Sequence, residues 1–214
     1  KDMYFEQAVT ELRGYPKLEG TRHVNMALIA KLIPSYMFMP GEFEEIGRIT
    51  DNRNDDFMFN QGRTRGYAKT KFHDYNIAYK TLAHLPNVQV FMEQIEAYKD
   101  YLVVSGQGLS EQMKDFDYLL AVGELFTMVA YGQLIIESAR MEGVSDEIMN
   151  QMFDVFVRDF SSFAVDLYGK PLNTDAQIEK IIKMIKRPVP NDAEFEKILN
   201  EEAYSLVDVY QQNP

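Results

Sequence analysis

A short turn, Leu18-Glu19-Gly20-Thr21, holds the residues of this chain best suited to chemistry. Glycine lets a substrate approach the backbone closely, and the amino end of the helix expected next favours negative charge. A carboxylate that faces an apolar pocket has a raised pKa, which brings it toward the working range of a general base. Glu19 could therefore act as a base. The alternative is an ordinary helix start with Thr21 as the N-cap, which the residue types alone favour.

A second candidate site is the segment 61–66, which reads QGRTRG. Two guanidinium groups, from Arg63 and Arg65, together with backbone amides freed by glycine could hold an anion the size of a phosphate. The same arginines could instead pair with carboxylates of a neighbouring helix or subunit and hold the loop in place. The sequence favours neither reading over the other.

Other common site patterns are missing from the sequence. There is no G-x-G-x-x-G segment, Walker loop or H-E-x-x-H motif, no cysteine, and the three histidines are widely spaced. We therefore expect no metal site, and we interpret His73-Asp74 as a hydrogen-bonding pair at a helix start. Aromatic residues at helical spacing could suggest a box for a flat-ring cofactor, but they are more typical of a helical core. These residues are Tyr131, Phe153, Phe156, Phe160 and Phe163.

The composition limits the partners and the location. The 33 acidic and 22 basic residues give a net charge of −11, which would repel nucleic acid. Residues 1–10 do not resemble a signal peptide, and the absence of an initial methionine suggests a piece of a longer protein. The most apolar stretch, 119–136, is interrupted by polar residues and is expected to be a buried core helix rather than a membrane span. We expect a cytoplasmic protein with no membrane partner.

Helical periodicity and end signals predict an all-α fold, an antiparallel helical bundle. A long irregular connection over 39–71 separates two predicted parts, 1–38 and 72–214. We expect Gly14 and Pro16 to end the first helix, Pro34 to end the second, and Ser110 to cap the longest. The predicted helices cover residues 1–13, 22–33, 74–84, 86–105, 110–143, 145–169, 174–187 and 192–211.

The Glu19-Gly20-Thr21 turn resembles the active-site turn of acyl-CoA dehydrogenases, commonly Tyr-Glu-Gly-Thr followed by a helix. Further segments resemble the tail of bacterial acyl-CoA dehydrogenase-like proteins in the same order, namely 61–66, 71–75, 84–88 and 157–171. The chain departs from the family pattern in two places, since Leu18 replaces the tyrosine and Arg22-His23-Val24 replaces an asparagine- or alanine-led continuation. The resemblance implies that the chain is the carboxyl-terminal part of such a fold.

The resemblance also implies a function for each residue of the turn. Glu19 would remove the α-proton of an acyl-CoA thioester, and its backbone N–H would help polarise the thioester carbonyl. Gly20 would lie against the substrate, Thr21 would be directed toward FAD, and His23 would occupy the place of a further cofactor contact. An electron-transfer flavoprotein and a homo-oligomer, a dimer or tetramer, are the implied partners. The barrel and most helices that hold flavin precede this motif in the family, so we expect no catalysis by this chain alone.

A different function remains open at this stage. Apolar helix faces and the arginine-bearing loop would also suit a non-catalytic helical module that forms oligomers or binds a partner protein. In that case the turn would be retained without its chemistry.

Overall fold

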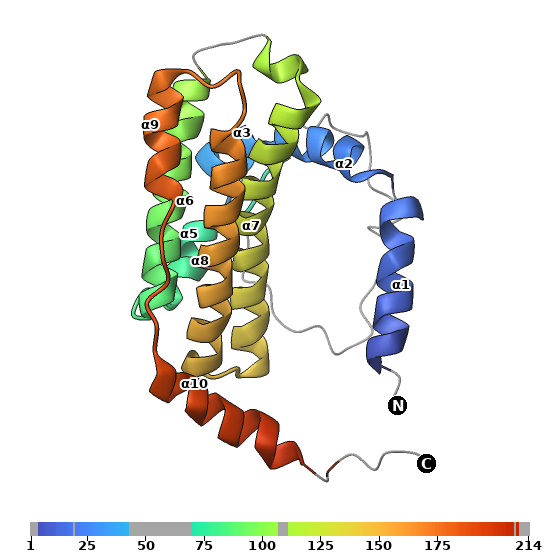
Figure 1. Cartoon of the computed structure of the whole chain (residues 1–214), viewed down its shortest axis with the longest axis vertical. Helices are drawn as coiled ribbons and strands as arrows, with labels where there is room; N and C mark the ends of the chain where they lie inside the picture. Colours follow the sequence, from blue (N-terminus) through green and yellow to red (C-terminus); the bar gives the residue numbers. More distant parts are fainter. Residues whose placement is uncertain (1–3, 19, 43–69, 107–110, 208, 210–214) are drawn as a thin grey trace.

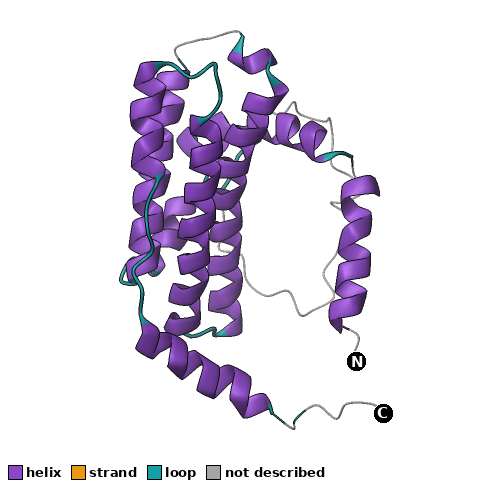
Figure 2. Ribbon diagram, in the orientation of Figure 1, coloured by secondary structure: helices purple, strands orange, loops and turns teal. Residues whose placement is uncertain are grey.

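The computed structural model describes residues 4–18, 20–42, 70–106, 111–207 and 209, and these residues form helices and connecting turns without a strand (Figure 2). The α-helices are α1 (Tyr4–Leu18), α2 (Arg22–Ile29), α3 (Ile33–Phe38), α5 (Tyr75–Thr81), α6 (Pro86–Ser105), α7 (Phe116–Glu142), α8 (Asp146–Tyr168), α9 (Asp175–Met184) and α10 (Asp192–Ile198). The predicted all-α fold is confirmed.

Four helices, α6 to α9, make up the bundle (Figure 1). They alternate in direction along the chain, α9 packs on α6, and α8 packs on α6, α7 and α9. Helices α2 and α5 pack on α7, whereas α1 extends away from the bundle and α10 leaves its opposite end. Gly41 N–H donates to Phe72 C=O at 2.7 Å, so the chain leaves and re-enters the described part at neighbouring points.

Helix α7 is the buried helix that the apolar stretch 119–136 predicts. It is the one helix among the described residues that is long and apolar enough to cross a membrane. Of the 18-residue apolar window in this helix, 67% is buried inside the fold. A helix with so much apolar surface needs cover on most sides, which here comes from α2, α5 and α8.

The core is built around the ring of Phe91 in α6. Its ring centroid lies 5.9 Å from that of Tyr79, 5.5 Å from those of Phe153 and Phe156, and 5.4 Å from that of Phe160. Most of these contacts are edge-to-face, an arrangement that aromatic rings prefer to a flat sandwich. The prediction that these aromatic residues of α8 form core is confirmed for Phe153, Phe156 and Phe160, which are buried.

Tyr131 departs from that prediction, because 55% of its surface is exposed. Its ring stacks on Phe156 with centroids 5.7 Å apart and thus covers the edge of the core rather than entering it. Helical spacing alone cannot tell the rim of an apolar stripe from its centre.

Buried tyrosines hydrogen-bond to the backbone of α7. The Tyr79 hydroxyl donates to Val129 C=O at 2.7 Å, and the Tyr98 hydroxyl donates to Val122 C=O at 2.9 Å. Burial raises the pKa of both phenols well above the usual value, so they remain neutral donors. Each tyrosine thereby buries a large ring without leaving its hydroxyl unsatisfied.

Several helix ends agree with the sequence prediction. Asp74 caps α5 by accepting from Asn76 N–H at 2.9 Å, and Pro86 lies in the first turn of α6. Thr174 and Gln177 form a capping box at the start of α9, and Gly143 ends α7 in the left-handed conformation with φ of 70°. These signals act through nearby backbone atoms, which explains their agreement.

Other ends differ from the prediction. Helix α1 continues past Gly14 and Pro16 to Leu18, with the loss of the backbone hydrogen bond that proline cannot donate. Pro34 does not end helical structure but lies in the first turn of α3, where no intrahelical N–H bond is needed. Ser110 lies outside the described residues, and Asp115 caps α7 by accepting from two backbone N–H groups. Helix α9 ends at Met184 rather than at residue 187.

The predicted final helix, 192–211, is shorter and is attached at its beginning. Helix α10 continues as a π-helical turn over Leu199–Ala203 and a 3-10 turn over Tyr204–Leu206. Asn150 Nδ2 of α8 donates to Glu194 Oε2 at 2.7 Å, and Lys197 pairs with Glu147 at 2.5 Å. These two contacts attach the beginning of α10 to α8.

Substituting Gly132 with alanine should destabilise the bundle, because a Cβ at this position would collide with the Tyr79 hydroxyl. We expect Gly132→Ala to lower the free energy of unfolding by about 1–3 kcal/mol, the usual cost of overpacking, measured by urea denaturation. Adding Tyr79→Phe removes the colliding oxygen, so the double variant should lose less than the sum of the two single losses. Strictly additive losses would contradict this account.

Acid should release α10 before the bundle unfolds. The hydrogen bond from Lys197 lowers the pKa of Glu147 below its ordinary value of 4.5, so the contact stabilises docking above that pH and is lost as the pH falls through the lowered pKa. Amide signals of α10 in NMR spectra should shift as the pH falls below about 4.5, while the bundle stays folded. Lys197→Met should produce the same shifts at neutral pH, and α10 signals indifferent to both changes would contradict the assignment.

Candidate functional site

The best-defined candidate site is the turn at the amino end of α2. Gly20 has a φ of 97°, and a Cβ at this position would lie 3.3 Å from Asn25 Oδ1. Thr21 follows in an extended conformation and caps α2, since its Oγ1 accepts from Val24 N–H at 3.4 Å. The backbone thus needs glycine at position 20, and the threonine cap that the sequence suggests is confirmed.

This turn presents several hydrogen-bond donors to a ligand. Thr21 Oγ1 accepts one bond from the backbone, so its own O–H is still available to donate. The first N–H groups of a helix have no intrahelical acceptor, and no described residue accepts a hydrogen bond from the backbone N–H of Arg22 or His23 at the positive end of α2. Such an arrangement suits an acceptor atom or a negatively charged group of a cofactor or substrate.

An ion pair fixes the turn to the bundle. Arg22, the first residue of α2, pairs with Glu124 of α7. The Glu124 side chain is only 8% exposed, whereas that of Arg22 is 59% exposed. A buried carboxylate requires a partner, so the position of Arg22 is set by the bundle interior.

Close packing of α2 on α7 supports the same position. A Cβ on Gly123 would lie 3.2 Å from Met26 Sδ and 3.5 Å from the Met26 carbonyl oxygen, so the two helices approach closely there. Thr127 Oγ1 lies 3.7 Å from the same sulfur and also donates to Gly123 C=O at 2.8 Å. The middle of α2 is therefore packed closely against α7.

The structure describes some of the predicted site residues and not others. Gly20, Thr21 and His23 lie together at the start of α2, and the His23 side chain is exposed. Glu19 and both arginines of the candidate anion site, Arg63 and Arg65, lie outside the described residues.

Sequence reasoning missed the contribution of Arg22 and Glu124. Glu124 was treated only as an interruption of the apolar stretch 119–136. A single carboxylate within a helix expected to be buried is itself a signal, because it must find a cation or a set of donors. The sequence does not say which of its 22 basic residues would be that cation.

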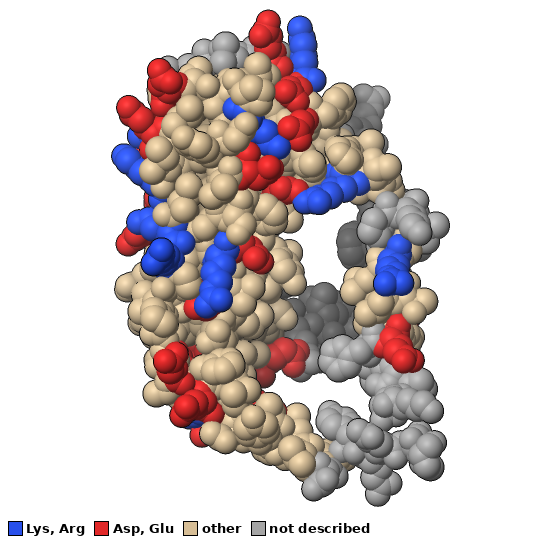
Figure 3. Space-filling model, in the orientation of Figure 1, with Lys and Arg blue, Asp and Glu red and all other residues tan. Residues whose placement is uncertain are grey.

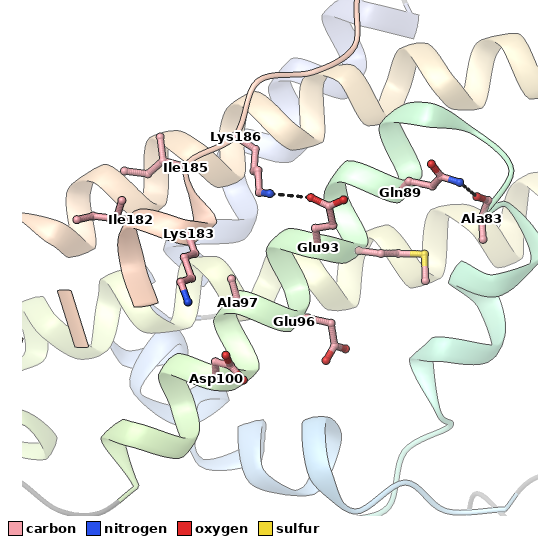
Figure 4. Close-up of a pocket in the computed structure, with 11 residues that line it drawn as sticks. Ala83, Gln89, Glu93, Glu96, Ala97, Asp100, Ile182, Lys183, Ile185 and Lys186 are labelled. Carbon is pink, nitrogen blue, oxygen red and sulfur yellow. Dashed lines mark hydrogen bonds and ion pairs between the residues drawn. The ribbon is translucent and has the colours of Figure 1, made fainter. Parts of the chain in front are cut away.

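A second concave region lies between α6 and α9, a shallow cleft of about 870 Å³ (Figure 4). Carboxylates of α6, from Glu93, Glu96 and Asp100, line one side, and Lys183 of α9 and Lys186, two residues after that helix ends, line the other. Lys186 pairs with Glu93 at 2.6 Å, and the side chain of Lys183 reaches from α9 toward α6. Exposed ion pairs of this kind contribute at most about 1 kcal/mol each to folding stability. We therefore interpret the cleft as a charged contact between two helices rather than as a binding site.

The described part of the chain shows neither a separate cationic patch on the face in Figure 3 nor a metal-binding cluster. On the face shown in Figure 3, Lys and Arg side chains lie among Asp and Glu side chains rather than in a separate patch. Within the described residues, no group of three histidine or carboxylate side chains could hold a metal ion.

Comparisons with known proteins leave the site to be judged on its own chemistry. No protein-family model, no curated protein and no solved structure matches this chain. The resemblance to acyl-CoA dehydrogenases stays a prediction from the sequence.

Removing the Arg22 side chain should loosen α2 specifically. Arg22→Ala leaves Glu124 buried without its cation, and we expect a loss of about 1–3 kcal/mol, less than for a fully buried pair because Arg22 is half exposed. Hydrogen exchange of α2 amides should accelerate more than that of α8 amides. Adding Glu124→Gln should restore part of the loss.

A matched control is Arg158→Ala, which removes a pair with the buried Asp154 within α8. This variant should leave the exchange of α2 amides at the wild-type rate. Equal acceleration of α2 exchange in both variants would show that Arg22 has no special role in holding the turn.

Proposed function

We propose that this chain is the carboxyl-terminal helical part of an FAD-dependent acyl-CoA dehydrogenase-like enzyme, to which it contributes Glu19 as the catalytic base. The observation that supports this most is the Gly20 conformation, with a φ of 97° immediately before the Thr21 cap. An ordinary helix start needs an N-cap but no left-handed glycine before it. A glycine enforced at this place allows close approach of a substrate to the backbone.

The residues of the turn fit the groups that such an enzyme binds. The Thr21 hydroxyl can donate to an acceptor atom of FAD while its oxygen caps α2. The exposed N–H groups of Arg22 and His23 lie at the positive end of the helix, where an electron-rich edge would be stabilised. His23 is exposed and would be the second cofactor contact. FAD would supply the hydride acceptor.

In this proposal the chain supplies the base that removes the substrate proton. The Glu19 carboxylate takes the α-proton of the acyl-CoA thioester as the C–H bond breaks, and the β-hydrogen leaves as hydride, so that an α,β double bond forms. The Glu19 N–H donates to the thioester carbonyl oxygen, which carries the developing negative charge. The proposal includes an electron-transfer flavoprotein as electron acceptor, a homo-oligomeric assembly and a cytoplasmic location. The Arg63 and Arg65 pair would hold an anionic group.

A second candidate is a non-catalytic helical module that binds a partner or a second copy. Exposed apolar side chains favour it, since Val9 and Leu12 of α1 are 50% and 63% exposed and Tyr131 and Leu134 of α7 are 55% and 61% exposed. These side chains are spaced by three residues within each helix and would present apolar ridges to a partner.

The two candidates are separated by a flavin experiment on a chain extended to include the preceding domains. The wild-type protein should bind FAD and bleach anaerobically with acyl-CoA. Glu19→Gln should retain FAD and lower the bleaching rate by about 10²–10⁴-fold, the usual contribution of a general base. Unchanged bleaching would remove Glu19 from this role. An extended chain without flavin, together with stoichiometric association of the 214-residue chain, would establish the second candidate.

Two substitutions of Thr21 separate its cap from its cofactor contact. Thr21→Ser keeps both hydroxyl functions and should bind FAD as the wild type does, whereas Thr21→Asp keeps a cap acceptor but loses the donor. Equal FAD affinity of the two variants would contradict a hydroxyl contact to the cofactor.

A further inference from the structure

A small cavity of about 30 Å³ lies between α5 and α6. The described residues of its wall all come from these two helices, and they are Tyr75, Asn76, Tyr79, Met92, Ile95 and Glu96. One water molecule takes up about 30 Å³ in the liquid, and a space of about 10–15 Å³ is enough to hold it inside a protein. The cavity is therefore too small for a metabolite but large enough for a single water molecule.

The wall of this cavity contains a buried hydroxyl group without a partner. Tyr75 is only 2% exposed, and its Oη makes no hydrogen bond to any described residue. Its ring stacks on that of Tyr36 with centroids 5.5 Å apart, which holds the ring, and with it the hydroxyl oxygen, in place. A buried hydroxyl costs free energy unless another group or a bound water replaces the hydrogen bonds that it loses on folding.

Two further polar side chains meet the same cavity. Burial raises the pKa of the Tyr75 phenol above its usual value, the Glu96 carboxylate raises it further, and the Asn76 side chain acts in the opposite sense. Both side chains are therefore near the phenol oxygen, and both line the cavity. A hydroxyl, an amide and a carboxylate can together offer a water molecule the three hydrogen bonds that buried waters typically make.

The charge of this site favours a neutral occupant over a metal cation. Glu96 already pairs with Lys99 at 3.3 Å, and its side chain is 62% exposed. A single carboxylate with a cation beside it does not supply the set of oxygen ligands that magnesium or calcium requires. Because the Glu96 side chain is in contact with solvent, a molecule bound beside it can exchange with bulk water.

We propose that this cavity binds one long-lived water molecule, which accepts a hydrogen bond from Tyr75 Oη and donates one to the Glu96 carboxylate. A third hydrogen bond joins the water to the Asn76 side chain. The water thus bridges α5 and α6 and replaces the hydrogen bond that the Tyr75 hydroxyl loses on folding. The site needs neither flavin nor acyl-CoA and is independent of the turn at Gly20.

The test uses the complete 214-residue chain and oxygen-17 relaxation dispersion, which counts water molecules that stay bound while the protein tumbles. Tyr75→Phe keeps the ring and removes the hydroxyl, so the dispersion amplitude should fall by the contribution of one water molecule. The matched control is Tyr79→Phe, because Tyr79 lines the same cavity but its hydroxyl already donates to Val129 C=O at 2.7 Å. This control should keep the wild-type amplitude. An amplitude unchanged in Tyr75→Phe, or equal falls in both variants, would overturn the proposal.

Two further measurements check the same site. With a bridging water in place, Tyr75→Phe should lower the urea midpoint of unfolding or leave it unchanged, whereas removal of a hydroxyl buried in a dry cavity would raise it. A raised midpoint would therefore contradict the bound water. A crystal structure of the wild-type chain should show a water within hydrogen-bonding distance of Tyr75 Oη. A map without that water would refute the assignment even if neither variant folds.

Discussion

The structure depends on the close approach of other helices to α7. This helix has 27 residues, and its apolar surface has to be covered. Gly123 admits Met26 of α2, and Gly132 admits the ring of Tyr79, whose hydroxyl then reaches Val129 C=O. Both glycines lie within a helix, so their value here is the missing side chain rather than backbone freedom. The positions of α2 and α5 are consequences of this contact.

Burial of Glu124 adds selectivity to that packing. Taking a carboxylate out of water costs several kcal/mol of free energy. A cation offsets this cost only when it lies close to the carboxylate in good geometry. Apolar contact alone would tolerate small shifts of α2 along α7. The pair with Arg22 penalises such shifts, because each would leave the charge unpaired. The ion pair thus contributes to the position of the Gly20–Thr21 turn more than to the stability of the bundle.

Helix ends and helix packing differed in how well the sequence predicted them. Asp74 and Gly143 were correctly identified because each acts on backbone atoms a few residues away. The end predicted at Pro34 was wrong because the same residue type can end one helix or begin another, depending on where the chain must go next. Tyr131 was assigned to the core, yet it lies at its edge, where the neighbouring helix decides how far the apolar stripe is covered.

By itself, the sequence determined that the chain is helical and approximately where its helices lie, and it predicted Glu19-Gly20-Thr21 as the candidate site. Those properties follow from short-range preferences of the backbone and of capping side chains. Only the tertiary structure decided that Arg22 meets Glu124, and that Tyr75 and Glu96 line one cavity. Such contacts join residues far apart in the chain, and they depend on which helix surfaces meet and at what register, which no local pattern specifies.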